Sequence, residues 1–208
     1  MTEIIQGTEE WFAARIGKVT ASRLSDVMAR TKTGYGASRA NYMTELVLER
    51  LTGRRAEGYT NAAMQWGIDT EADAKAAYEF RTNAEIVSVG FIDHPLIDMT
   101  GASPDGLIGE DGLIEIKCPN SATHIDYLLT GMVPKKYDLQ MQWQMACTGR
   151  QWCDFVSYDP RLPPNLSMLV KRIDRDNDLI AEMEIEVREF LDEVTRTVEL
   201  LGKIGAQK

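Results

Sequence analysis

Hydrophobic and polar positions along the chain first follow a helical period and later alternate as in strands. Residues 9–30 predict two short helical stretches broken near Gly17, with Thr20 or Ser22 as the N-cap of the second. Residues 31–36 contain two glycines and predict a polar loop. The N-terminal part therefore contains short, interrupted elements.

Two longer helices are predicted next. The first begins at Ser38 and ends before Gly53, which fits a C-cap. Its apolar positions lie near helical spacing: Tyr42, Leu46 and Leu51. The second spans 64–80 and is rich in alanine. It offers three aromatic side chains for packing: Trp66, Tyr78 and Phe80.

From residue 85 onward the pattern becomes that of strands. Residues 85–92 are β-branched and alternating, and further strands are predicted at 99–103, 106–108, 113–117, 154–158 and 166–173. The Asp-Gly pair at 111–112 indicates a hairpin between the predicted strands 106–108 and 113–117. Helices follow at 121–129, 137–148 and 176–204. This order predicts an α/β fold, a single domain over 1–208 with a central mixed β-sheet flanked by helices.

Composition indicates where the protein is located in the cell and which kind of metal site it could contain. No apolar run approaches the length of a membrane span, and the N-terminus lacks a basic segment followed by an apolar core, so we expect a cytoplasmic protein. The three cysteines have no metal-binding spacing, and there are only two histidines. Any metal site would therefore consist of oxygen ligands. The net charge of −9 is unusual for a DNA-binding protein, which would have to gather its Lys and Arg along one groove.

Two acids and a lysine are the main candidates for chemistry. Asp105 precedes the first hairpin strand, while Glu115 and Lys117 share one face of the second. A hairpin would bring the two carboxylates together, and their repulsion would be relieved by a divalent cation such as Mg²⁺. The alternative is a solvated cross-strand pair. Glu115 and Lys117 lie within an apolar strand, however, where unpaired charges are costly.

Several ordered motifs carry a resemblance to a known family. Pro104-Asp105 with Glu115-x-Lys117 resembles the PD-(D/E)xK nuclease signature, whose core is restriction-endonuclease-like. Across nearly the whole chain the sequence resembles the YqaJ-type viral recombinase family, to which the phage lambda exonuclease belongs. The matching stretches are Trp11-x-x-x-Arg15-x-Gly17-x-x-Thr20-Ala21-Ser22, Trp66-Gly67-x-x-x-Glu71, Ser103-Pro104-Asp105-Gly106-Leu107, Glu115-Ile116-Lys117-Cys118-Pro119, Gln140-x-Gln142 and Tyr158-Asp159-Pro160-Arg161.

The resemblance implies a bacterial or phage-encoded enzyme. It would be a Mg²⁺-dependent 5′-to-3′ exonuclease that degrades one strand of double-stranded DNA from its end, with one or two ions and with Mn²⁺ as a possible substitute. The remaining 3′ single-stranded tails would serve a single-strand annealing recombinase. Such enzymes work as a homotrimer ring around DNA, which would allow a basic channel within an acidic exterior.

The resemblance also implies roles near the metal. Asp105, Glu115 and the backbone carbonyl of Ile116 would hold the ion, and Lys117 would orient or deprotonate water or stabilise charge. Glu71 would support the site, although a helical glutamate is ordinarily just exposed. Gln140 would point to the site, with Gln142, on another helix face, packing or facing solvent.

DNA-binding roles are implied for five residues. Arg15 would grip a 5′-phosphate with help from Ser22 and Ser103. Met64 would separate terminal base pairs, and Lys32 is a candidate DNA contact in a loop that departs from the family. The alternatives are a surface arginine, capping or turn serines and a filler methionine. The motif at 158–161 is interpreted as a structural turn.

Other functions remain open from the sequence. The nearest alternative is another nuclease of the same superfamily, such as an endonuclease or a 3′-directed exonuclease. A DNA-end-binding or scaffold protein without catalysis is a second. A Ca²⁺-binding module is disfavoured because no D-x-[DN]-x-[DN]-G loop is present.

Overall fold

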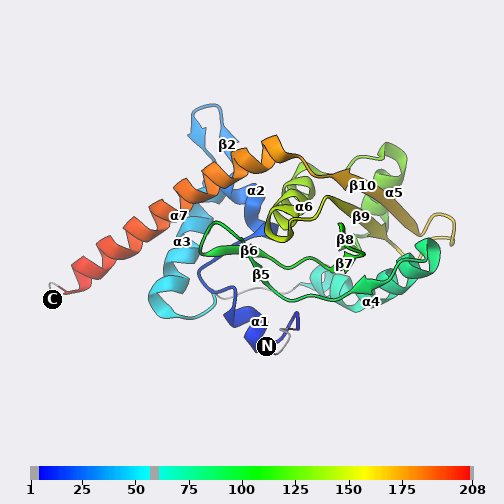
Figure 1. Ribbon diagram of the computed structural model, residues 1–208, viewed down its shortest axis with the longest axis horizontal. Helices are drawn as coiled ribbons and strands as arrows, with labels where there is room; N and C mark the ends of the chain where they lie inside the picture. The colour runs from blue at the N-terminus through cyan, green and yellow to red at the C-terminus, as the bar shows by residue number, and fades with distance from the viewer. Residues whose placement is uncertain (1–4, 57–60, 207–208) are drawn as a thin grey trace.

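The computed structural model describes residues 5–56 and 61–206. The residues at the extreme N-terminus on which the expectation about a leader rests, 1–4, lie outside this range. The helices are α1 (Glu9–Ala13), the 3₁₀ helix η1 (Ala21–Arg23), α2 (Leu24–Val27), α3 (Ala37–Thr52), α4 (Ala62–Thr82), α5 (Ser121–Thr130), α6 (Lys135–Thr148) and α7 (Asn177–Ala206) (Figure 1).

The strands form a five-stranded sheet, a three-stranded sheet and a separate hairpin. Their bounds are β1 (Val19–Thr20), β2 (Arg30–Thr31), β3 (Gly34–Tyr35), β4 (Ile86–Val87), β5 (Ile92–Asp93), β6 (Thr100–Ala102), β7 (Gly106–Ile108), β8 (Gly112–Lys117), β9 (Trp152–Tyr158) and β10 (Met168–Asp174). The larger sheet has the order β10-β9-β8-β7-β4 and is mixed, because β8 and β9 run parallel while its other pairs are antiparallel. The predicted mixed α/β class is confirmed, with a second small sheet, β1-β6-β5, beside the main one.

The hairpin β7–β8 has the predicted position. Gly106 pairs with Ile114 and Ile108 with Gly112, which leaves a three-residue turn. Gly109 begins that turn at φ +52°, a conformation that favours glycine. Gly112 is needed for a different reason: a Cβ there would lie 2.1 Å from the Trp152 ring. The turn and the close approach together fix the register that places residue 105 near residue 115.

The prediction of one strand over 85–92 is wrong. Two two-residue strands begin within this segment, and they belong to different sheets: β4 pairs with β7, and β5, which ends at Asp93, pairs with β6. The chain therefore passes from one sheet to the other within this stretch. The alternating pattern did not reveal this break. It also did not predict burial correctly, because the apolar side chain of Val87 is 52% exposed.

Predictions within residues 9–36 also need correction. The second helical stretch begins as strand β1 and continues as η1 and α2. Ser22 lies inside η1, and Thr20 is at its N-cap position without a capping hydrogen bond. The predicted loop contains the hairpin β2–β3. These elements are too short for periodicity to reveal them.

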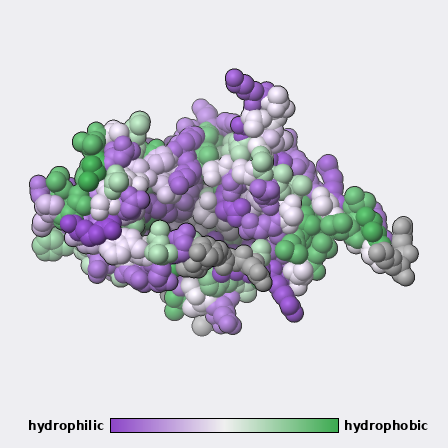
Figure 2. Space-filling view, turned by 180° about the vertical axis from the view of Figure 1, so that it is seen from behind, coloured by the Kyte–Doolittle hydropathy of each residue, from purple (hydrophilic) through white to green (hydrophobic). Residues whose placement is uncertain are grey.

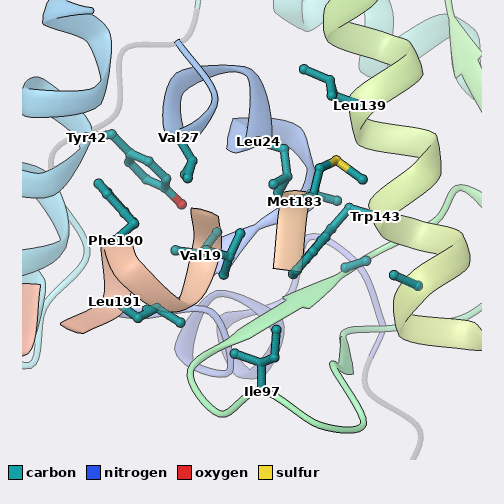
Figure 3. Packing of buried hydrophobic residues seen from close by; sticks show 14 of the residues in the cluster. Val19, Leu24, Val27, Tyr42, Ile97, Leu139, Trp143, Met183, Phe190 and Leu191 are labelled. Carbon is teal, nitrogen blue, oxygen red and sulfur yellow. The ribbon is translucent and has the colours of Figure 1, made fainter. Parts of the chain in front are cut away.

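Helix α6 is the buried, central helix of the fold. Every residue from 139 to 147 is buried, because different faces of the helix serve different neighbours. Leu139 and Trp143 enter the core formed with α2, α3 and α7 (Figure 3). Met141 and Met145 pack with Leu113 and Phe155 on the main sheet. The helix thus connects the two parts of the fold.

The helices α3, α4 and α7 each leave apolar side chains exposed. Gly53 caps α3 in the left-handed region as predicted, but Leu51 is largely exposed. Tyr78 of α4 is buried, whereas Phe80 is 94% exposed and does not pack as predicted. The C-terminal end of α7 projects beyond the body, and apolar side chains cover it: Leu200, Leu201 and Ile204 (Figures 1 and 2).

Candidate active site

The hairpin brings Asp105 and the strand that carries Glu115 together. Asp105 directly precedes β7, and its carboxylate accepts a hydrogen bond of 2.6 Å from the backbone N–H of Ile116 in β8. Glu115 is 1% exposed. Ile114 and Ile116 pack on the face toward Ala74 and Tyr78 of α4, so strand alternation directs Glu115 to the other face, toward α6.

Three partners surround the Glu115 carboxylate. The side-chain amide of Gln140 donates to Oε1 at 2.7 Å, and that of Gln144 donates to Oε2 at 2.6 Å. Lys117, two residues along the same strand, forms an ion pair with it. Gln144 was missed from the sequence, although it lies four residues after Gln140 and therefore on the same helix face. A buried carboxylate with this many partners is held in one orientation.

The charges of these residues depend on one another. Burial raises the pKa of Asp105, and the nearby Glu115 raises it further. Burial alone would lower the pKa of Lys117, but Glu115 and Asp105 outweigh it, and the pKa is raised. The two carboxylates thus favour a positive charge beside them, which in this structure is the Lys117 ammonium.

The donor atoms fit a hard cation better than a soft one. Carboxylates of Asp105 and Glu115 are available, and the carbonyl of Ile116 directly follows Glu115 in the sequence. Cys118 is adjacent, but burial raises the pKa of its thiol to about 12, so without a metal the thiol is protonated at neutral pH. Within residues 5–56 and 61–206, no three or more His, Cys, Asp or Glu side chains are grouped as a metal site. A bound ion would therefore need water or substrate oxygens as further ligands.

Glu71 lies at the edge of the same cavity. This Asp105 cavity, defined by Glu71, Asp105, Ile116 and Lys117 with Met64 and Gly67, has a volume of about 480 Å³. Glu71 is paired with Lys75 at 2.9 Å. Glu71, predicted to support the site, thus lies near Asp105, but its carboxylate is paired with Lys75, one turn further along α4.

A second cavity of about 320 Å³ adjoins the first, and Met64 lines both. This Arg15 cavity is also lined by Ser22 and Arg55. Nη1 of Arg15 donates to the Ser103 hydroxyl at 3.3 Å, and the guanidinium lies 3.9 Å from the centre of the Trp11 ring.

Arg15 has no ion pair among the described residues. Burial lowers its pKa to about 10, with the nearby Arg55 adding to the effect and the phenol of Tyr42 and Glu49 opposing it. The side chain still carries its charge at neutral pH. An anion in the cavity would therefore stabilise it. Arg55 is a second cation that the sequence did not single out.

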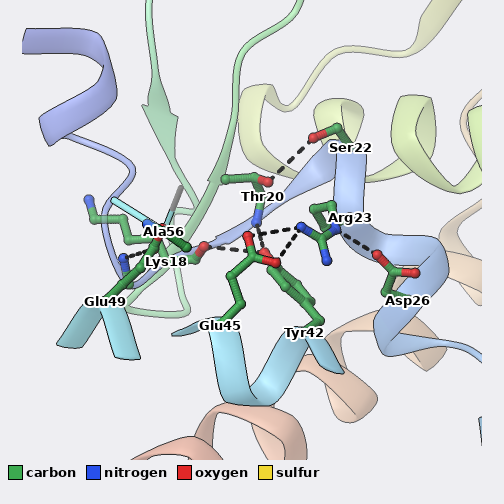
Figure 4. Close-up of polar contacts among 10 residues, drawn as sticks. Lys18, Thr20, Ser22, Arg23, Asp26, Tyr42, Glu45, Glu49 and Ala56 are labelled. Carbon is green, nitrogen blue, oxygen red and sulfur yellow. Dashed lines mark hydrogen bonds and ion pairs between the residues drawn. The ribbon is translucent and has the colours of Figure 1, made fainter. Parts of the chain in front are cut away.

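Hydrogen bonds fix the floor of the Arg15 cavity (Figure 4). The Tyr42 hydroxyl accepts from the Thr20 N–H at 3.1 Å. Arg23 donates to both oxygens of Glu45, at 3.0 and 2.9 Å. The hydroxyls of Ser22 and Thr20 lie 3.4 Å apart. Arg23 is thus neutralised by local acids, whereas no acid among the described residues forms an ion pair with Arg15.

Other predicted residues lie away from these cavities. Lys32 is exposed in the turn between β2 and β3, a hairpin that projects beside α7 (Figure 1). Gln142 donates to the carbonyl of Asp174 and accepts from the N–H of Asp176, so it packs and has a structural role. Both histidines are buried, and His124 is bonded to Ser157 and the carbonyl of Leu166. None of the helices in the described ranges is long and apolar enough to cross a membrane.

Known proteins share this fold and sequence. The chain is 56% identical to an alkaline exonuclease, LHK-Exo, from Laribacter hongkongensis, with a TM-score of 0.90 over 96% of this chain and 99% of the other. The structure of LHK-Exo in complex with dAMP gives 56% identity over the same shares of the two chains and a TM-score of 0.91. A phage-related exonuclease from Haemophilus somnus is 17% identical over 90% of this chain and 96% of the other, with a TM-score of 0.70, and shares the fold.

More distant sequence similarity exists in a giant virus. An uncharacterised protein of Acanthamoeba polyphaga mimivirus is 26% identical over 73% of this chain, which spans only 28% of that protein's length. The model of the YqaJ-like viral recombinase domain matches residues 10–151, well over half of the sequence. The expected family is thereby confirmed: this chain belongs to the YqaJ-like viral recombinase family.

Proposed function

We propose that the whole chain, 1–208, acts as one Mg²⁺-dependent exonuclease domain that degrades one strand of duplex DNA from its 5′ end. The convergence of the half-buried Asp105 and Lys117 on the buried Glu115 carries this proposal, because it combines hard-oxygen ligands with a fixed cation. The 56% identity to a protein described as an alkaline exonuclease supports the class of reaction.

The residues divide the chemical work. Asp105, Glu115 and the carbonyl of Ile116 would hold one or two Mg²⁺ ions, or Mn²⁺ in their place. When bound, Mg²⁺ supplies charge stabilisation at the phosphate and lowers the pKa of a coordinated water. Gln140 and Gln144 keep the Glu115 carboxylate in place. Lys117 provides a positive charge beside the reacting phosphate, where it orients water or stabilises developing negative charge.

The Arg15 cavity explains the direction of cleavage within this proposal. A 5′-phosphate would neutralise the half-buried Arg15, with the hydroxyls of Ser103 and Ser22 as further donors. Ser103 is two residues before Asp105, so an anchored 5′ end would lie next to the carboxylates. Met64, between the two cavities, would separate the last base pair. Lys32 is a candidate contact with more distant DNA.

The products and partners follow from the same proposal. Removing one strand would leave 3′ single-stranded tails, the substrate of a single-strand annealing recombinase. A homotrimer ring would keep the enzyme on DNA despite the net charge of −9. A bacterial or phage-encoded protein acting on DNA in the cytoplasm fits this role.

Digestion of end-labelled linear duplexes tests the proposal. We expect release of 5′ mononucleotides in Mg²⁺ or Mn²⁺ and none in EDTA, with faster digestion of 5′-phosphate than 5′-hydroxyl ends. Lys117→Ala should abolish cleavage while end binding, measured in Ca²⁺ by fluorescence anisotropy, persists. Cleavage of a closed circle would contradict an exonuclease, and wild-type turnover by Lys117→Ala would remove this residue from the mechanism.

A further inference from the structure

The turn after β9 links elements on both sides of the Asp105 cavity. Asp159 is fully buried, and Arg161 donates to its two carboxylate oxygens at 2.7 and 3.0 Å. The backbone N–H of Arg161 also donates to Asp159 at 3.0 Å. The prediction of a structural turn at 158–161 is confirmed. The bonds to Asp159 also hold the guanidinium of Arg161 in a position where it contacts other elements.

Arg161 contacts two segments that line the Asp105 cavity. Its Nη2 donates to the carbonyl of Pro119 at 3.1 Å, two residues after Lys117. Its guanidinium carbon lies 4.5 Å from the centre of the Trp66 ring in α4, two residues after Met64. A cation over an indole face is attractive, and Trp is the best partner for it. One side chain thus joins the end of β8 to the start of α4.

Within the described parts of the chain, the start of α4 has little other support. Apart from Trp66 and Gly67, which are half-buried, residues 62–69 are exposed, and Met64 is 52% exposed. Thr70 is the first buried residue of the helix. Within residues 62–69, the hydrogen bonds of Met64 and Gln65 are local, to Asn61 and Asp69. Trp66 is therefore the large side chain that ties these two turns to the rest of the described structure.

This support matters for a side chain that must push apart paired bases. Unpairing a terminal base pair costs free energy, so the separating side chain must not yield when the duplex meets it. Met64 lies on the weakly packed turns, whereas Asp105 and Lys117 lie on the sheet. Without a connection between them, the duplex would displace the helix start and remain paired.

We propose that Arg161 and Trp66 form a latch that holds the Met64 end of α4 against the end of β8, and that this latch enables the protein to open base-paired DNA ends. The inference rests on the proposed function. Trp66 and Arg161 are positioning residues in it. They also line a neighbouring cavity of about 550 Å³, together with Pro119 and Tyr137, so the latch lies beside the Asp105 cavity.

The test compares two DNA ends. Trp66→Leu should lower kcat/KM about tenfold on a blunt 5′-phosphorylated duplex, the loss of one well-placed cation–π contact. On the same duplex with its last few base pairs mismatched, the change should stay within about twofold, because those ends are already open. Trp66→Phe, which keeps an aromatic face, should recover most of the activity. Phe80→Leu is the matched control, since Phe80 is on the same helix and 94% exposed.

Equal losses on paired and mismatched ends, or no loss on either, would overturn the latch. Hydrogen exchange tests it without DNA and thus separately from the proposed nuclease activity. In Trp66→Leu, the amides of residues 62–69 should exchange about tenfold faster than in the wild type, while those of 70–82 stay unchanged. Unchanged exchange at 62–69 would show that Trp66 does not hold the helix start. Inactive wild-type protein would instead contradict the proposed function.

Discussion

The carboxylate of Glu115 shows how a buried charge is prepared for chemistry. At 1% exposure it has lost its water, and Gln140, Gln144 and Lys117 replace those hydrogen bonds. Charge-assisted hydrogen bonds of this kind are stronger than neutral ones and restrict the rotamer. The geometry is thus established before any cation or DNA arrives. The amides serve Glu115, and Glu115 in turn orients Lys117.

Substituting the two glutamines separately should reveal this division of roles. We expect Gln140→Ala or Gln144→Ala to reduce kcat about tenfold or more, because one oxygen of Glu115 then lacks its donor. Gln142→Ala is the matched control, since its bonds are to the backbone of Asp174 and Asp176. It should lower stability by about 1 kcal/mol and leave kcat unchanged. Steady-state digestion and urea unfolding measure both effects; a drop in kcat for Gln142→Ala would contradict the assignment.

The convergence of the acids was predictable from the sequence. The Asp-Gly pair and the alternation in 113–117 defined a hairpin, and the hairpin placed Asp105 beside Glu115. Gln144 was not found, because its role depends on which face of α6 meets the sheet. Its spacing from Gln140 was the available signal. The pairing of Glu71 with Lys75 was also missed, although a spacing of four residues in a helix favours it.

At the scale of elements, the turn at 158–161 stabilises the region where β8, α4 and β9 meet. Burial would raise the pKa of Asp159, but hydrogen bonds from Arg161 and Ser121 outweigh it and lower the pKa to about 2. The unfolded chain has the ordinary value of about 3.9 and binds the proton more tightly. The stabilisation is therefore complete above pH of about 4 and is lost as the pH falls toward 2.

Urea unfolding from pH 7 to pH 2 in the absence of metal tests this pH dependence. We expect Asp159→Asn to be less stable than the wild type by about 1 to 2 kcal/mol at neutral pH. This difference should shrink between pH of about 4 and about 2, where the wild type loses the charged pair. Asp98→Asn, at an exposed position, controls for a simple change in net charge. A constant difference down to pH 2 would show that Asp159 is not the responsible group.

Elements with several turns or a full hairpin were predictable, and very short ones were not. Helices α3, α6 and α7 lie within a few residues of their predicted ranges. Strands β4 and β5 have two residues each, so their sheet membership depends on partners far along the chain. The same holds for β1, which pairs with β6 about eighty residues away. Local pattern contains no information about such pairings.

The whole molecule combines an acidic composition with a locally basic cavity. Four cations line the Arg15 cavity: Arg15, Lys18, Arg23 and Arg55. Lys18 and Arg23 are paired with acids, whereas the half-buried Arg15 and the exposed Arg55 have no ion pair among the described residues. We expect this cavity to supply the local cations that DNA binding would require of a chain with a net charge of −9. The proposed ring would arrange three such cavities around one channel.

Sedimentation velocity should detect the ring as a species of three times the chain mass. The projecting end of α7 is the surface we expect to contact a neighbour, because exposed apolar residues gather there. Replacing both Leu200 and Ile204 with Glu should therefore reduce the mass of the assembly. Leu96→Glu, at a site 72% exposed on another part of the surface, is the control. A monomeric wild type would contradict the ring.

Helix α6 has a consequence for how this sequence can change. One face carries Gln140 and Gln144, a second enters the α7 core, and a third packs on the sheet. Inserting or deleting a single residue in α6 would rotate all later residues of the helix by about 100° about its axis. The glutamine, tryptophan and methionine side chains would then all face the wrong neighbours. We therefore expect natural variants to keep the length of this helix constant and to vary instead at the projecting end of α7 and in the β2–β3 hairpin. Evolution can alter the periphery of this fold gradually, but it can alter α6 only by coordinated replacement.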